Sequence, residues 1–180
     1  MTHIARSALV PYTAHEMFAL VADIPSYPKF LPWCGGARIL SRDEDLVVAS
    51  IDVAYKGVHK TFTTRNRLQT DKVLEMSLVE GPFRHLHGNW LFNSVGDRIE
   101  PRAADRNGSP APFGRSSCPN TRSGGGFGTD ACRVSFDLDF EVANRLLAVV
   151  INPVFTGIAN QMVDSFAARA RVVYGPREVA

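Results

Sequence analysis

Apolar residues recur every three or four positions in the last part of the chain, from residue 144 to residue 174. This spacing is the period of one helix face, so it predicts a long amphipathic helix whose apolar side must be covered. Pro153 interrupts the pattern, and Asn152 before it is a residue type favoured at helix N-caps. We therefore expect a kink, or a short helix that runs into a long one, near Ile151. The apolar positions are Leu147, Ile151, Val154, Ile158, Met162, Phe166, Ala170 and Val173.

Most of the chain before this helix alternates apolar and polar residues with the period of two that is typical of strands. The predicted strands are 3–11, 38–42, 46–55, 59–69, 73–79, 85–92 and 131–142. The links between successive strands from 38 to 92 are short, which favours antiparallel pairing. Thr13 and Glu16 form a capping box that predicts a short helix, ending before Pro25. This order predicts an α+β domain in which a curved antiparallel sheet wraps around a long C-terminal helix.

Two segments break the alternation. Residues 25–36 (PSYPKFLPWCGG) combine prolines and glycines with large apolar side chains, so we expect a loop that plugs the edge of the core or forms a lip over a binding site. Residues 97–130 are rich in Pro, Gly, Ser and Arg and have no periodicity. We interpret them as a disordered insertion in a hairpin of one domain that spans residues 1–180.

Composition narrows the class of protein. The chain has 180 residues, of which 45% are hydrophobic and 21% charged, the balance of an ordinary globular domain. A formal net charge of +2 is too small to argue for nucleic-acid binding by itself. Three widely spaced cysteines indicate neither a disulfide framework nor a zinc site. The N-terminus has no apolar signal core, and no run of 18 apolar residues occurs, so we expect a cytoplasmic location, with peripheral membrane contact left open.

Several short motifs resemble one protein family. They follow the family's order, and together they are specific, although each alone is a weak signal. The stretch 97–130 departs from the family pattern, where a short turn is usual. The motifs are YPKFLPWC at 27–34, KTFTTRN at 60–66, EGPFRHL at 80–86 with Gly88 and Trp90, FDLDF at 136–140, and Met162, Val163, Phe166, Arg169 and Ala170. With them the chain resembles the coenzyme Q-binding and polyketide cyclase-like proteins of the START superfamily, which include bacterial ribosome-association toxins.

The resemblance implies a helix-grip fold that holds a hydrophobic ligand between the sheet and the helix. In the respiratory branch of the family the implied ligand is ubiquinone or a similar prenylated quinone. The implied role there is that of a non-enzymatic lipid chaperone or carrier supporting respiratory electron transport. In the toxin branch the implied role is binding to the large ribosomal subunit and blocking subunit association. The sequence does not separate these two branches, and we take the quinone carrier as the first hypothesis.

The candidate ligand-binding residues are apolar side chains on the predicted inner faces, plus two polar ones on the strand 59–69. A packed core is the plainer interpretation of the apolar set. For Thr64 and Asn66 the alternatives are contact with a quinone carbonyl or a bond to a neighbouring strand or water. The candidates are Phe30, Leu31, Trp33, Phe62, Thr64, Asn66, Met76, Phe83, Leu86, Trp90, Phe155, Ile158, Met162 and Phe166. We expect segments 25–36 and 80–86 to form the mouth, with exposed aromatic residues that dip into a membrane, and the 153–170 face to form the lid.

Other candidate chemistry is weaker. His85 and His87 face one side of a strand, but no acidic or cysteine ligand lies near them in sequence, so we predict no metal site. Asp137, Asp139 and Glu141 are expected on the wet face of their strand, with Arg65 or Arg67 as partners. No acid, base and electrophile converge, so we expect no enzyme and no cofactor other than the bound quinone. Scattered basic residues would meet phosphates on a ribosome, or balance the 18 acidic residues of the surface.

Overall fold

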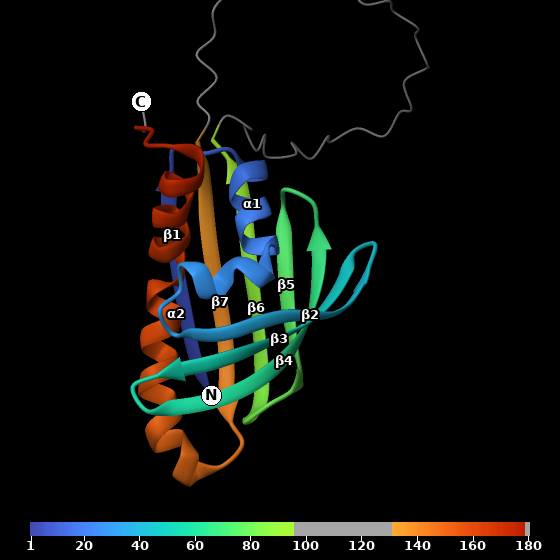
Figure 1. The fold of residues 1–180 in the computed structure, drawn as a ribbon, viewed down its shortest axis with the longest axis vertical. Helices are drawn as coiled ribbons and strands as arrows, with labels where there is room; N and C mark the ends of the chain where they lie inside the picture. The colour runs from blue at the N-terminus through green and yellow to red at the C-terminus, as the bar shows by residue number, and fades with distance from the viewer. Residues whose placement is uncertain (96–130, 179–180) are drawn as a thin grey trace, which may run out of the picture.

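The computed structural model describes residues 1–95 and 131–178. Figure 1 shows one sheet with a long helix along it and a shorter helix over the same face. This is the predicted α+β helix-grip architecture. The elements are β1 (Thr2–Val10), α1 (Ala14–Ala22), the 3-10 helix η1 (Ile24–Lys29), β2 (Cys34–Asp43), β3 (Leu46–Tyr55), β4 (Val58–Gln69), β5 (Val73–Glu80), β6 (Phe83–Ser94), β7 (Cys132–Val142) and α2 (Arg145–Tyr174).

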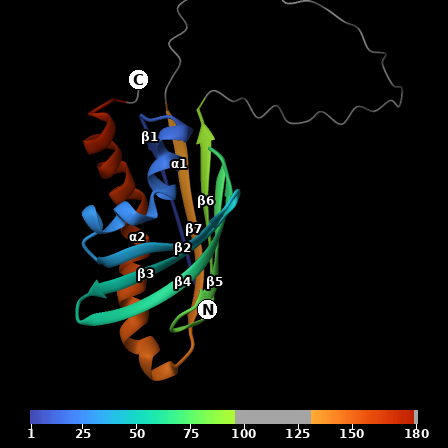
Figure 2. The same cartoon turned by 45° about the vertical axis from the view of Figure 1, so that its right-hand side comes forward.

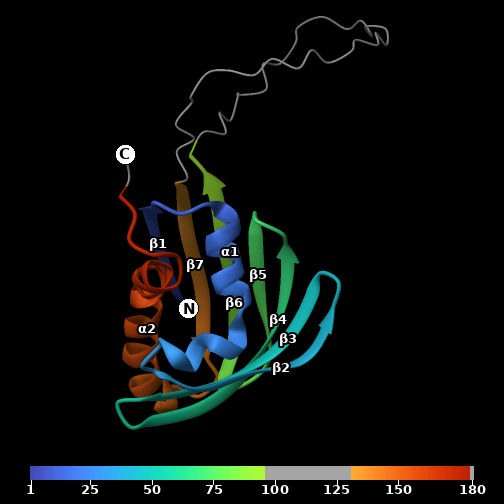
Figure 3. The ribbon, with the colours of Figure 1, turned by 45° about the horizontal axis from the view of Figure 1, so that its top comes forward.

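The seven strands form one antiparallel sheet in the order β1-β7-β6-β5-β4-β3-β2. The sheet curves strongly, so that β2, β3 and β4 run across the direction of β6 and β7 and wrap toward α2 (Figures 1 and 3). Register shifts interrupt the pairing and leave extra residues on β2, β5 and β6. Such bulges bend and twist a strand, which lets a sheet close around a helix.

The helix α2 is continuous from Arg145 to Tyr174, so of the two alternatives the separate helix with an N-cap at Asn152 is wrong, and the kink stays a prediction. Its N-cap is Asn144, whose side-chain oxygen accepts a hydrogen bond of 2.8 Å from the Leu146 N–H. Pro153 lies inside the helix on its exposed face, and it removes the N–H that would bond the Val149 carbonyl. Val149 is itself exposed, so that carbonyl can be hydrated, and the helix tolerates the proline there.

The predicted capping box at the start of α1 is confirmed. The Glu16 N–H donates to the Thr13 hydroxyl at 3.1 Å, and the Thr13 N–H donates to the Glu16 carboxylate at 2.9 Å. Arg177, after the end of α2, donates two hydrogen bonds of 2.9 Å to the same carboxylate. The Tyr174 hydroxyl also donates to the Glu16 carbonyl at 3.2 Å. The start of α1 is therefore joined to the C-terminal end of α2 (Figure 2).

The expected partners of the acidic row on β7 are wrong. Arg65 and Arg67 lie on β4, which is separated from β7 by β5 and β6. Instead Asp139 contacts His3 on β1 at 2.8 Å, and Glu141 lies 3.6 Å from Arg84 on β6. Sequence alternation identified the wet face, but the order of strands in the sheet decided the partners.

The predicted insertion at 97–130 lies outside the described residues. The strands on both sides of it are described, and they pair with each other from Phe83 and Val142 to Ser94 and Cys132. The Val95 N–H donates to the Ala131 carbonyl at 2.8 Å. The chain therefore leaves and re-enters the sheet at one point.

Candidate ligand-binding site

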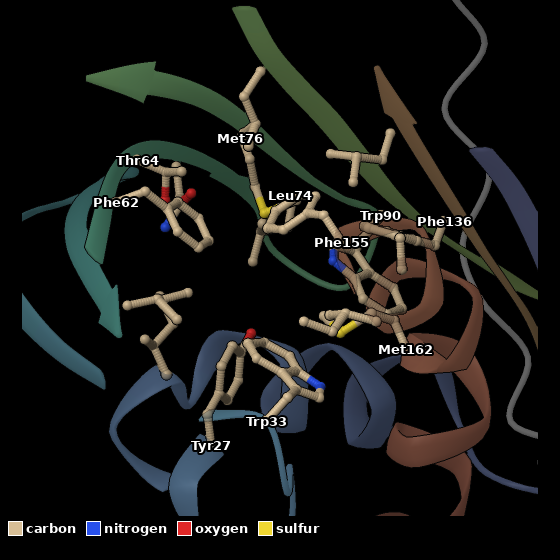
Figure 4. Close-up of a pocket in the computed structure, with 17 residues that line it drawn as sticks. Tyr27, Trp33, Phe62, Thr64, Leu74, Met76, Trp90, Phe136, Phe155 and Met162 are labelled. Atoms are coloured by element: carbon tan, nitrogen blue, oxygen red, sulfur yellow. The ribbon is translucent and has the colours of Figure 1, made fainter. Parts of the chain in front are cut away.

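A cavity of about 50 Å³ lies between the concave face of the sheet, α2 and the η1–β2 segment. In Figure 4, Tyr27 and Trp33 point into it from one side, Phe62, Thr64, Leu74 and Met76 from the opposite strands, and Phe155 and Met162 from α2. Its walls are almost wholly apolar. They are formed by Ile24, Tyr27, Trp33, Ile51, Phe62, Thr64, Asn66, Leu74, Met76, Leu86, Trp90, Phe136, Leu138, Phe155, Ile158, Ala159 and Met162.

Two polar atoms in this wall have no hydrogen-bond partner among the described residues. They are the indole nitrogen Nε1 of Trp33 and the side-chain oxygen Oδ1 of Asn66. Both side chains are buried, with 4% of Trp33 and 2% of Asn66 exposed. An unpaired buried polar group costs about 1–3 kcal/mol, so such atoms are expected to find a partner. Both residues belong to the cavity wall, so a ligand that shifts these side chains could pair with one donor and one acceptor.

Tyr27 and Thr64 also bring polar groups to the wall, and the Tyr27 hydroxyl already has a hydrogen-bond partner. It donates a hydrogen bond of 2.6 Å to the Val21 carbonyl. Burial, with smaller contributions from Cys34 and Asp23, raises the pKa of the Tyr27 hydroxyl far above its ordinary value. The group therefore stays neutral, and it offers no acid or base for proton transfer near neutral pH.

Ten of the residues selected from the sequence lie in the cavity wall, and four do not. Phe83 contacts Phe155 next to the cavity, with ring centroids 4.8 Å apart. Phe30 and Phe166 meet edge to face with ring centroids 5.2 Å apart, and Leu31 is buried in the core. The ten in the wall are Trp33, Phe62, Thr64, Asn66, Met76, Leu86, Trp90, Phe155, Ile158 and Met162.

Sequence reasoning missed seven residues of the wall. Phe136 and Leu138 belong to the buried face of β7, which the alternation had identified, but only the register with Trp90 and Gly88 on β6 places them at the cavity. Tyr27 was noted in the 25–36 segment, and the 3-10 turn of η1 directs it inward. The missed residues are Ile24, Tyr27, Ile51, Leu74, Phe136, Leu138 and Ala159.

The aromatic residues of the 25–36 segment are not the exposed mouth that we expected. Tyr27 and Trp33 are buried, and Phe30 is half-buried with the Arg169 guanidinium over its ring at 5.3 Å. These rings are buried because packing against the cavity wall and α2 removes their apolar surface from water. The exposed large apolar residues of the described chain are aliphatic, together with Met1.

The size of the cavity limits what fits. A water molecule needs about 10–15 Å³ of cavity volume open to its centre, so a cavity of about 50 Å³ has room for a few waters. Drug-sized ligands occupy pockets of about 300–1,000 Å³. A prenylated quinone would therefore require side chains to move, and Met76 and Met162 are flexible enough to do so. The long dry channel expected for an isoprenoid tail is not open in this structure.

The cysteine thiols and the potential metal ligands of the described chain do not form a reactive site. Cys34 and Cys132 are free and buried, and burial raises the pKa of both thiols to about 11. Both thiols are therefore protonated at neutral pH and weak as nucleophiles. Within residues 1–95 and 131–178, no three His, Cys, Asp or Glu side chains are grouped closely enough to hold a metal ion.

Known proteins match this chain along almost all of its length. The toxin PasT of Escherichia coli O6:H1 ("persistence and stress-resistance toxin") is 39% identical over 98% of this chain and 92% of its own. The "ribosome association toxin RatA" of Escherichia coli K12 is 38% identical with the same coverage. A more distant relative is the mitochondrial "coenzyme Q-binding protein COQ10 homolog B" of Xenopus laevis. It is 23% identical over 97% of this chain and 60% of its own.

Solved structures share the fold. An 18 kDa protein of Caulobacter crescentus is 26% identical with a TM-score of 0.64, covering 98% of this chain and all of that one. The ZhuI aromatase/cyclase of Streptomyces sp. R1128 is 16% identical with a TM-score of 0.65, covering 98% and 99% of the two chains. The model of the family described as "polyketide cyclase / dehydrase and lipid transport" matches residues 10–167. The resemblance drawn from the motifs is thereby confirmed, and the chain belongs to this START-like family.

Proposed function

We propose that this protein acts by binding rather than by catalysis, as a ribosome-associating protein of the RatA type. The observation that carries the proposal is an identity of 37–39% to toxins named PasT and RatA, over nearly the full length of both partners. This identity favours ribosome association over the quinone carrier, which was our first hypothesis from the sequence. The named coenzyme Q-binding relative is more distant, at 23% identity.

The outer face of the sheet supplies a surface for such a partner. Arg65 and Arg67 project from β4 on that face, both exposed, and neither has an ion pair within the described residues. Arg38 is exposed on β2, on the same outer face but separated from β4 by β3. Unpaired arginines suit the phosphates of ribosomal RNA because each guanidinium can donate two parallel hydrogen bonds. Binding of this kind weakens as salt rises, since released counterions drive it.

The test is sedimentation of the purified chain with isolated large ribosomal subunits through sucrose gradients. We expect co-sedimentation at about 50 mM salt that fades by about 200 mM. Arg65→Gln with Arg67→Gln should weaken binding and flatten its dependence on salt. Arg171→Gln, an exposed arginine on α2 and not on the sheet, is the matched control and should bind like the unmodified chain. Absence of the chain from the large-subunit fraction at low salt would exclude this function.

A second candidate function is binding of a hydrophobic ligand such as a prenylated quinone. The observation that favours it is the apolar cavity with two unpartnered polar atoms, on Trp33 and Asn66. A quinone carbonyl would accept from the Trp33 N–H, and displaced Met side chains would make room for the ring. Solvent extraction of natively produced protein followed by mass spectrometry tests it. Quinone near one per chain supports this candidate, and an empty extract from folded protein counts against it.

A further inference from the structure

The first two turns of α2 carry a cluster of exposed apolar residues. Leu146 is 82% exposed, Val149 77% and Val150 54%, and Leu147 is exposed beside them. Single exposed apolar residues are normal on a protein surface, but four within two turns form a patch. In Figures 1 and 2 this end of α2 extends past the ends of the strands. We call Leu146, Leu147, Val149 and Val150 the apolar tip.

Two turns of the sheet lie beside the apolar tip. The Ala143 N–H donates to the Pro82 carbonyl at 2.9 Å, which holds the β5–β6 turn against the start of α2. A narrow cleft joins Val58 of the β3–β4 hairpin to Ile151, in the next turn of α2. The tip is therefore held in place by the fold, and its exposure does not come from a loose chain end.

Basic residues lie at the start of α2 and on the hairpin that adjoins its next turn. Arg145 begins α2 and is exposed, and Lys56 and Lys60 are exposed on the adjacent β3–β4 hairpin. Glu80 on the β5–β6 side is an exposed acid, whereas Glu141 lies 3.6 Å from Arg84. Among Arg145, Lys56, Lys60 and Glu80, the three cations outnumber the one acid.

We propose that the apolar tip docks on an anionic lipid bilayer. Leu146, Val149 and Val150 would enter the boundary between headgroups and acyl chains, while the cations contact lipid phosphates. An apolar helix surface next to lysine and arginine is the pattern of proteins that lie at a membrane interface. RNA fits less well, because aliphatic side chains offer no aromatic face for bases to stack on. A dimer formed through two apolar tips would bring the basic residues of both copies together, and this repulsion disfavours a second copy of the chain as the partner.

The rest of α2 argues for docking on the membrane rather than crossing it. By length and composition α2 could span a bilayer, but 39% of its most apolar window is buried inside the structure. From Ile151 onward its apolar side covers the sheet, with Ile158, Met162 and Phe166 all buried. Inserting the whole helix would expose the core to water, whereas inserting the tip leaves the fold intact.

Docking would also bring the cleft between α2 and the β3–β4 hairpin to the bilayer surface. This cleft shares Phe62 and Phe155 with the cavity, and their ring centroids are 5.7 Å apart. Rotation of these two rings would join the cleft to the cavity. This route for a ligand into the cavity matters only if the protein binds a hydrophobic ligand, the second candidate function. Docking of the apolar tip does not depend on it.

The test is pelleting of the full chain with vesicles of phosphatidylglycerol and phosphatidylcholine, or of phosphatidylcholine alone. We expect binding to the anionic vesicles that falls with salt. Leu146→Gln with Val149→Gln should lower the bound fraction about tenfold or more. Lys56→Gln and Lys60→Gln should each weaken binding about fivefold at low salt. The control is Val172→Gln, which changes a 76% exposed valine at the other end of α2 and should leave binding unchanged.

Three results would overturn the proposal. The first is no pelleting with anionic vesicles, and the second is equal loss in the tip variant and in Val172→Gln. The third is a tip variant that still binds vesicles but no longer self-associates on a sizing column or no longer binds the large subunit. Because large-subunit sedimentation is measured separately, failure of the ribosome function and failure of membrane docking are distinguishable.

Discussion

At the scale of single residues, Asn66 shows how the cavity differs from an ordinary core. Its side chain is 2% exposed in an apolar wall, and its oxygen has no partner among the described residues. A residue chosen only for stability would be apolar there, because an unpaired buried amide costs more than it contributes. Retaining an amide at such a position is typical of sites that sacrifice stability for binding.

We expect Asn66→Leu to raise the free energy of unfolding of the ligand-free protein by about 1–2 kcal/mol, because it removes an unpaired buried group at similar volume. Urea denaturation followed by fluorescence measures this change. Asn93→Leu, at an exposed position on β6, is the control and should change stability by less than about 0.5 kcal/mol. A clear loss of stability in Asn66→Leu would mean that the amide has a partner such as an internal water.

At the scale of elements, Glu16 connects α1 to the end of α2. Burial opposes ionisation of Glu16, but hydrogen bonds from Thr13 and Arg177 outweigh it, so the pKa of its carboxyl lies below the ordinary value of 4.5. Because the folded pKa is below the unfolded one, the ionised carboxylate stabilises the fold at pH values above 4.5. That stabilisation is lost as pH falls through the folded pKa.

Glu16→Gln keeps an acceptor for the Thr13 N–H but loses the ion pair with Arg177. We expect it to lower the free energy of unfolding by about 0.5 kcal/mol at pH 7 and to flatten its decline below pH 5. Urea denaturation at several pH values between about 7 and 3 measures both effects, given the ordinary carboxyl pKa of about 4. Glu44→Gln, in the exposed β2–β3 turn, should leave the pH profile unchanged. A Glu16→Gln profile that matches the unmodified protein would contradict this account.

At the scale of the whole molecule, the strands on the two sides of residues 96–130 pair with each other directly. The Val95 N–H and Ala131 carbonyl that flank this stretch are already hydrogen-bonded at 2.8 Å. We expect that joining Val95 to Ala131 through Asn-Gly yields a folded protein. It should be more stable by about 1–2 kcal/mol, because a shorter loop costs less closure entropy.

Urea denaturation of this shortened chain measures the change, and sizing chromatography confirms that it is a single species. Large-subunit sedimentation and vesicle pelleting then show whether residues 96–130 take part in either proposed interaction. Failure of the shortened chain to fold would mean that residues 96–130 hold part of the structure together.

Much of the fold could be predicted from local pattern. The 3.6-residue period of the C-terminal segment identified α2, and the period of two on 131–142 identified β7, because each repeat reflects which side of an element is buried. The capping box at Thr13 and Glu16 identified the start of α1, since its donors and acceptors lie within four residues. Motif order then indicated the START-like family.

The tertiary structure alone decided what depends on residues far apart in the chain. Strand order set the partners of Asp139 and Glu141, and register brought Phe136 beside Trp90. The cavity is only about 50 Å³ because rings from α2, β4 and η1 converge in it, and no local period encodes that convergence. The apolar tip is exposed because the sheet ends before α2 begins to pack. The sequence by itself therefore determined which faces are apolar, and the tertiary arrangement determined which of those faces are covered.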